Sequence, residues 1–239
     1  MKLREILLSL VVLAAWPLAE VSRAQDDAVL PVPLDELLLR FNRSQQAVQS
    51  LTATFTERKE LSLLARPVVA HGTFLYGKPD RIKWEYSEPE PKVFLITEER
   101  FVAYYPSQKR AEEVPLSKLA GRRVFRVFGI GQTAEDLQKF FEISQSDPGN
   151  EKGAYLLILT PKRRRVKDRL QLVRFWVDGK TYLPRKLEYL ESDGDSTLLT
   201  FANIRLNPEI AEGRFNLDIP KDVQVSSTFS GFSGSGLSR

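Results

Sequence analysis

The sequence contains no cysteine and only one histidine, His71. Structural disulfides, metal sites built from cysteine and histidine, and a Cys/His catalytic pair are therefore excluded. His71 lies in an alternating segment beside Gly72 without a nucleophile-elbow pattern, so we interpret it as a structural or surface residue. A Ser/His/Asp arrangement is the catalytic alternative that the sequence leaves open. We predict that the chain is not an enzyme and has no catalytic residues, bound metal or cofactor.

Other signs of enzyme or nucleic-acid chemistry are also missing. The acidic pairs at residues 98–99 and 112–113 are neighbours in or beside strand-like segments, so their side chains point to opposite faces and form no acid/base pair. Residues 129–131, Gly-Ile-Gly, lack the strand and phosphate-binding context of a dinucleotide fingerprint, and we interpret them as a hinge. The formal net charge is only +4, which is too small to indicate a nucleic-acid partner.

An apolar run long enough to suggest a targeting segment occurs only near the N-terminus, over residues 6–15. Lys2 and Arg4 precede it. Residues 21–24 follow it, and the small side chains of Ser22 and Ala24 stand three and one positions before a cleavage site after Ala24. This is the layout of a cleaved secretory signal peptide. The alternative, a membrane anchor, needs about 20 apolar residues, and this run is shorter. We predict a signal peptide over residues 1–24 and a soluble mature protein without a cysteine-linked lipid anchor.

The rest of the chain is predicted to be mainly β. One helix is expected over residues 34–48, where apolar side chains recur at helical intervals. Short gaps between the later segments favour antiparallel pairing, because a parallel crossover needs about a dozen residues. One long sheet then curls towards a barrel. Strands are expected near residues 51–61, 68–77, 80–87, 92–98, 100–105, 108–114, 153–160, 168–178, 181–192, 195–204 and 213–218.

The hairpin rhythm breaks between residues 115 and 141. A short helix is expected from residue 133 to 141, because Thr133 is a good N-cap and acidic residues follow it. The apolar stretch at 124–131 precedes this helix and ends in the paired glycines. Residues 226–239 are rich in serine and glycine, so we predict a flexible tail after one main domain over residues 25–225.

Several strand-like segments are apolar on both faces, namely residues 93–96, 101–105 and 155–159. An antiparallel sheet with one face in water should instead alternate apolar and polar side chains. Both faces must therefore be covered, although few helices are available. Two interpretations remain open at this point: an ordinary packed core, or an apolar cavity enclosed by the curl of the sheet.

The strongest local charge feature is the basic run over residues 162–169. A solvated hairpin loop is one interpretation, and a contact for an acidic partner surface or anionic lipid headgroups is the other. Aromatic residues do not interleave the run, which argues against a platform for single-stranded nucleic acid.

The middle of the chain resembles the periplasmic lipoprotein carrier family, LolA. The resemblance begins with residues 72–86, GTFLYGKPDRIKWEY, and continues with the Phe-Leu-Ile segment at 94–96. It extends to the aromatic-proline turn at 104–106, to residues 159–162 and to the closing segment FNLDIPKDV at 215–223. These segments occur in the family's order along the chain.

The resemblance implies an unclosed antiparallel β-barrel of about eleven strands, with a helical lid over an apolar cavity. It implies a periplasmic chaperone that binds the acyl chains of lipoproteins and carries them from the inner to the outer membrane. The expected partners are an inner-membrane lipoprotein-releasing ABC transporter and, where one is present, an outer-membrane lipoprotein receptor; the carrier is expected to be a monomer. A carrier of another lipid, and an envelope regulatory module that binds a protein partner, are the alternatives.

The resemblance also places candidate site residues. Lys78 occupies the basic position before a proline, where enteric members use a basic residue to hold the lid closed; a lysine cannot make an arginine's fork contacts. The lid and hinge candidates are Lys78, Phe125, Gly129 and Gly131. The residues predicted to line the acyl cavity are Phe55, Phe74, Tyr76, Trp84, Tyr86, Phe94, Ile96 and Phe128. Their common face depends on strand register, because a slip of one residue exchanges the faces.

Overall fold

The computed structural model describes residues 31–116 and 130–228. The helices are α1 (Leu34–Ala47), α2 (Ala134–Gln138) and α3 (Arg164–Lys167), with 3-10 turns η1 (Pro106–Gln108) and η4 (Glu212–Phe215). The strands are β1 (Ser50–Glu60), β2 (Val68–Gly77), β3 (Arg81–Glu88), β4 (Lys92–Ile96), β5 (Arg100–Tyr105), β6 (Arg110–Pro115), β7 (Phe141–Ser146), β8 (Ala154–Pro161), β9 (Leu170–Asp178), β10 (Pro184–Glu191), β11 (Ser196–Leu206) and β12 (Gln224–Ser226).

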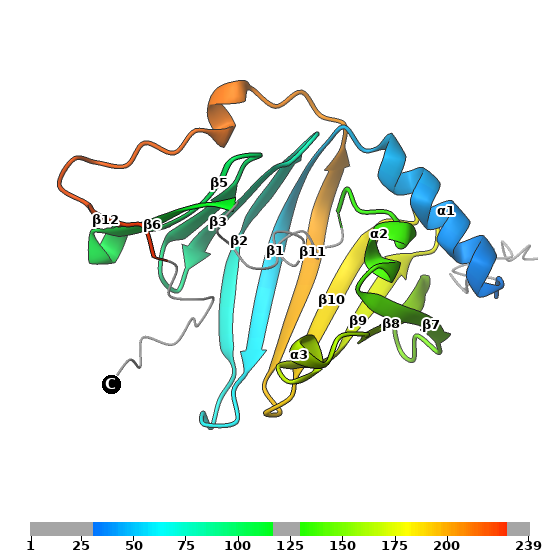
Figure 1. The fold of residues 1–239 in the computed structure, drawn as a ribbon. Helices are drawn as coiled ribbons and strands as arrows, with labels where there is room; N and C mark the ends of the chain where they lie inside the picture. The colour runs from blue at the N-terminus through cyan, green and yellow to red at the C-terminus, as the bar shows by residue number, and fades with distance from the viewer. Residues whose placement is uncertain (1–30, 117–129, 229–239) are drawn as a thin grey trace, which may run out of the picture.

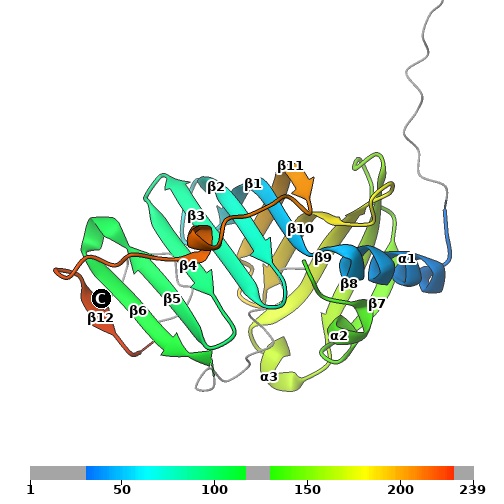
Figure 2. The same ribbon diagram turned by 90° about the horizontal axis from the view of Figure 1, so that it is seen from above.

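These strands form a single 12-stranded sheet in the order β12-β6-β5-β4-β3-β2-β1-β11-β10-β9-β8-β7. The pairs are antiparallel hairpin neighbours, except that β1 joins the distant β11 and β12 runs parallel to β6. The sheet curves strongly but ends at two separate edges, β7 and β12 (Figures 1 and 2). The predicted mainly β fold, an unclosed antiparallel barrel, is therefore confirmed.

The structure corrects several predicted elements. Residues 213–218 form no strand; they overlap the end of η4, and their alternation reflects the packing of Phe215 and Leu217 on the outer face of the sheet. The prediction missed β7, because the helix expected over residues 133–141 ends at Gln138. It also missed β12, whose last residue, Ser226, lies at the start of the predicted tail.

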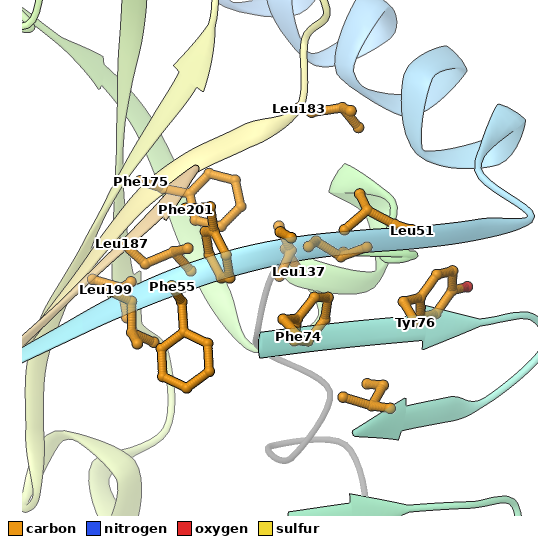
Figure 3. Close-up of a cluster of buried hydrophobic side chains, with 14 of the residues drawn as sticks. Leu51, Phe55, Phe74, Tyr76, Leu137, Phe175, Leu183, Leu187, Leu199 and Phe201 are labelled. Carbon is orange, nitrogen blue, oxygen red and sulfur yellow. The ribbon is translucent and has the colours of Figure 1, made fainter. Parts of the chain in front are cut away.

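The concave face of the sheet, here called the inner face, carries the main core. Aromatic rings from β1, β2 and β3 meet edge to face there: the ring centroids of Phe55 and Trp84 are 4.8 Å apart, and those of Phe74 and Trp84 are 4.6 Å apart. Phe201 of β11 joins them, 5.7 Å from Phe74 (Figure 3). At the other end of the core, Phe41 of α1 packs on Phe175 of β9. These contacts join the two halves of the curved sheet.

Gly72 makes this aromatic packing possible. It stands opposite Phe55 in the β1–β2 pairing and opposite Tyr86 in the β2–β3 pairing. A Cβ atom at this position would lie 2.7 Å from two atoms of the Phe55 ring and would overlap the carbonyl oxygen of Glu85. A glycine is therefore required where the ring of Phe55 crosses the strand.

The segment after β11 covers the outer face of β2 to β5 (Figure 2). Phe215 is buried there against Leu75, Leu95 and Val102. The ammonium group of Lys83 donates to the carbonyl oxygens at 214 and 216, at 2.9 and 3.2 Å. Strands β2 to β5 are thus covered on both faces, which explains their two-sided apolar sequence.

Candidate functional site

An apolar cavity of about 420 Å³ lies on the inner face, towards the end of the sheet where α3 is found. Strands β3 and β4 contribute Trp84, Tyr86 and Phe94 to its wall. Tyr189 and Leu199, from β10 and β11, form the facing wall. Because most of the lining surface is aromatic and aliphatic, the cavity suits an apolar ligand.

A second cavity of about 200 Å³ adjoins the first. It lies beneath α2, between Tyr76 and Ile82 of the sheet and Leu137 of the helix. Ile96 and Phe140 line both cavities, so the two volumes are neighbours along the inner face. Helix α2 therefore covers a second cavity of mixed lining, which includes Asp80, Asp136 and Lys139 and continues from the apolar cavity along the inner face.

A larger hollow, of about 540 Å³, lies beside β10 and β11 but has a different character. Glu151, Arg185 and Lys186 line it and are already paired, with Lys186 Nζ 2.6 Å from Glu151 Oε1 and Arg185 Nη2 3.0 Å from Glu151 Oε2. An apolar ligand there would desolvate these charges. The smaller, apolar cavity is therefore the better candidate for a ligand site despite its size.

The described residues among the predicted cavity lining all belong to the inner-face cluster. Trp84, Tyr86, Phe94 and Ile96 line the large cavity, and Tyr76 lines the small one with Ile96. Two predicted residues, Phe55 and Phe74, do not line either cavity. Their rings pack edge to face against Trp84, which does. Contact of any of these side chains with a ligand stays a prediction. Phe128, Phe125 and Gly129 lie outside the described residues.

Gly131 and Lys78 occupy defined positions beside the helices. Gly131 has a φ of +76°, and its amide donates to Gln45 Oε1 of α1 at 2.8 Å. Tyr76 lies so close that a Cβ atom at 131 would be 2.6 Å from the ring carbon Cζ. Lys78 donates from Nζ to the carbonyl oxygen of Gln46, at 2.9 Å, near the end of α1, where a cation is favoured.

Gly131→Ala is expected to destabilise the connection into α2 beyond the backbone cost of a positive φ, which is about 1–2 kcal/mol. The added methyl group would force the Tyr76 ring away from residue 131. Hydrogen exchange of the amides of residues 130–138 would measure the loosening. Gly149→Ala is the matched control, because Gly149 has a φ of +64° and open space around it. Equal effects of the two substitutions would show that the contact of residue 131 with Tyr76 adds nothing to the destabilisation.

A polar cluster lies at the α3 end of the large cavity. Tyr86 Oη donates to Glu57 Oε2 at 2.8 Å, and Lys59 Nζ lies 3.5 Å from Glu57 Oε1. Burial and the neighbouring Glu57 carboxylate raise the pKa of Tyr86 well above its ordinary value. Lys92 Nζ lies 4.2 Å from the Tyr86 ring centroid, and burial lowers the pKa of this lysine. The apolar cavity thus has one polarised end.

Sequence reasoning missed this cluster and the wall formed by β10 and β11. Glu57 could have been noticed, because it continues the inner positions 51, 53 and 55 of β1 with an acidic side chain. Tyr189 and Leu199 carry no comparable signal, since their place opposite β3 depends on the curvature of the whole sheet. The single histidine, His71, is exposed, with Nδ1 3.1 Å from Thr56 Oγ1 and away from the cavity.

In the part of the chain that the structure describes, no helix combines the length and apolar character needed to cross a membrane. Within the same residues, no group of three or more His, Cys, Asp or Glu side chains is arranged to hold a metal ion.

Comparison with known proteins places this geometry in a family. The family model described as "Outer membrane lipoprotein carrier protein LolA" matches residues 46–218. An outer-membrane lipoprotein carrier protein of Cupriavidus necator is 28% identical over 181 residues, which cover 74% of this chain and 82% of the relative. One from Neisseria meningitidis serogroup C is 26% identical over 212 residues, covering 87% and 90%.

Among solved structures, an uncharacterized conserved protein from Thermus thermophilus superposes with a TM-score of 0.52. It is 14% identical, and the match covers 80% of this chain and 96% of that one, so it supports the fold alone. The family match, by contrast, spans most of the sequence and includes every strand that lines the two cavities. This chain therefore belongs to the LolA family of outer membrane lipoprotein carrier proteins.

Proposed function

We propose that this protein binds the acyl chains of lipoproteins in its inner-face cavities and carries them from the inner to the outer membrane. The observation that carries the proposal is the apolar cavity of about 420 Å³ that adjoins a second one beneath α2. Family membership supports the same function, because the relatives are named outer-membrane lipoprotein carrier proteins.

The size of the cavity sets the scale of binding. A water molecule occupies roughly 30 Å³ in the liquid, and a methylene group is of similar size. The large cavity therefore holds about a dozen methylene groups. Each methylene removed from water contributes about 0.8 kcal/mol, so one buried chain segment gains about 10 kcal/mol before the cost of ordering it. Such a ligand leaves slowly unless the protein changes shape. Release therefore requires a partner or a lid movement that lowers the affinity.

The lid in this proposal is α2 together with the segment that leads into it from residue 130. Gly131 joins this segment to α1 through Gln45, and Asn42 of α1 accepts from the backbone amide of Ala134 at 2.5 Å. Movement of α1 is thereby coupled to α2. Lys78, which holds the last turn of α1, acts on the lid through this helix in the proposed mechanism.

The proposed route follows from the family. Residues 1–24 act as a cleaved signal peptide, and the mature carrier works in the periplasm. An inner-membrane lipoprotein-releasing ABC transporter loads it, and an outer-membrane lipoprotein receptor, where the cell has one, accepts the cargo. The carrier travels as a monomer in this scheme.

Mass spectrometry of the protein purified from its native host is expected to identify acylated lipoproteins bound to it. The cavity is apolar and the expected affinity is high, so cargo should survive purification. A free glycolipid or terpenoid in the cavity would instead indicate a carrier of another lipid. An empty cavity with a stable protein partner would indicate an envelope regulatory module and contradict the proposal.

A further inference from the structure

The basic run seen in the sequence forms the connection between β8 and β9, and here it is called the α3 loop (residues 162–169). Arg164, Arg165 and Lys167 are exposed, and none of them makes an ion pair with another described residue. Among the described residues, Arg163 contacts the face of Phe140, with its guanidinium 5.9 Å from the ring centroid. Unpaired cations on one short turn form a concentrated positive surface.

The α3 loop stands at the opening of the large apolar cavity. Val166 and Arg169 of the loop, and the adjacent Leu170, line that cavity together with the aromatic side chains of β3 and β4. The positive surface and the apolar interior are therefore contiguous. A ligand that enters or leaves at this end passes the α3 loop.

Two further connections meet the α3 loop at the same end of the sheet (Figure 1). The turn between β10 and β11 contacts the loop, because Ser192 donates from its amide to the Arg169 carbonyl oxygen at 3.0 Å and from Oγ to that of Lys167 at 2.7 Å. The β1–β2 connection joins next, since the amide of Ser62 donates to Asp195 Oδ1 at 2.7 Å. Hydrogen bonds thus link the three connections into one rim.

The β1–β2 connection adds exposed apolar side chains to this rim. Leu63 is 92% exposed and Leu64 is 42% exposed, and Val68 and Val69 at the start of β2 are exposed as well. These four are most of the seven large apolar side chains that are exposed in the described part of the chain. Such a gathering beside a cavity mouth indicates an interaction surface.

We propose that this rim is a docking surface for an anionic lipid bilayer. The cations of the α3 loop contact the headgroups, Leu63 and Leu64 enter the interface, and the mouth of the cavity faces the membrane. Protruding apolar side chains beside unpaired cations are typical of membrane-surface binding. An acidic protein partner fits less well, because it would leave the protruding leucines without an apolar environment. The inference rests on the proposed function, since it gives the acyl chain a path between bilayer and cavity.

The expected attraction is weak enough to be reversible. Each cation near an anionic surface improves binding by about five-fold, and salt reduces this effect because exposed charges are screened. The acidic residues Asp193 and Asp195 in the neighbouring turn limit the attraction further. A carrier that must leave the membrane again requires such moderate binding.

Co-sedimentation with vesicles of phosphatidylglycerol and phosphatidylethanolamine tests the proposal. The purified protein is expected to bind these vesicles at low salt, to dissociate at high salt, and to bind phosphatidylcholine vesicles poorly. Combined substitution of Arg163→Glu, Arg164→Glu and Arg165→Glu should reduce binding more than ten-fold. The double substitution Leu63→Ser and Leu64→Ser should also reduce vesicle binding, although it leaves the net charge of the protein unchanged. If the protein does not bind anionic vesicles, the proposal is overturned, and an acidic protein becomes the partner that the rim fits.

The matched control is Arg43→Glu, Lys180→Glu and Arg205→Glu, which changes net charge equally at exposed positions remote from the rim. If it weakens vesicle binding as much as the α3 loop variant does, the proposal is wrong. Loading of a dansyl-labelled fatty acid separates this test from the proposed function. Normal loading with no vesicle binding overturns the docking surface alone, and vesicle binding without loading contradicts the carrier function.

Discussion

Thr197→Trp is expected to weaken acyl loading about 100-fold while the protein remains folded. Thr197 lines the large cavity from β11, between Lys59 of β1 and Tyr189 of β10. An indole ring there displaces roughly four methylene groups of ligand, a loss of about 3 kcal/mol. Tryptophan is favoured in strands, and the cavity gives its ring space, so the sheet should tolerate it.

Titration with a dansyl-labelled fatty acid would measure this effect, and circular dichroism would verify the fold. Thr200→Trp is the matched control, because Thr200 lies on the same strand but is exposed on the outer face. Its loading should equal that of the unmodified protein. Unchanged loading by Thr197→Trp would show that ligand does not occupy the cavity.

Phe74→Ala is expected to lower the free energy of unfolding by about 4 kcal/mol. The Phe74 side chain is fully buried and touches Trp84 of β3 and Phe201 of β11, so it joins the two sides of the sheet. Its removal leaves a void that Trp84 cannot fill without leaving its edge-to-face contact with Phe55. Because Trp84 also lines the cavity, part of the loss should appear as weaker ligand binding.

Urea unfolding followed by tryptophan fluorescence would give the stability change. Leu63→Ala removes a comparable apolar side chain that is 92% exposed, and it should change stability by less than about 0.5 kcal/mol. A small effect of Phe74→Ala would mean that the aromatic cluster adapts to the missing ring. The joint between the two halves of the sheet would then lie elsewhere, for example at Phe41 and Phe175.

The inner face of β1 to β4 could be predicted from sequence, because local alternation determines which side chains share a face. Phe74 pairs with Trp84, and Trp84 with Phe94, so positions separated by hairpin turns project together. The family resemblance identified this surface as a cavity wall. Alternation alone could not separate Phe55 and Phe74, which fill the core, from Tyr86 and Phe94, which line the cavity.

Features that depend on long-range packing could not be predicted. Residues 213–218 alternate like a strand because Phe215 and Leu217 pack on a sheet, but η4 and the extended segment beyond it do not pair with that sheet. The α3 loop contains a helical turn inside what was expected to be a plain hairpin. The loop lies beside Leu63 and Leu64 because hydrogen bonds join three connections that are far apart in the sequence. A local sequence pattern cannot predict such contacts.

The position of β1 in the middle of the strand order has a consequence for how the chain folds. Leu51 pairs with Tyr76 on one side and with Leu206 on the other, so one neighbour follows soon in the chain and the other comes near its end. Local hairpins can form quickly, whereas pairing across most of the chain is slow. The facing walls of the cavity therefore come together only when β11 reaches β1. We expect the cavity to appear in the last step of folding, so that an acyl ligand stabilises the completed protein and none of its precursors.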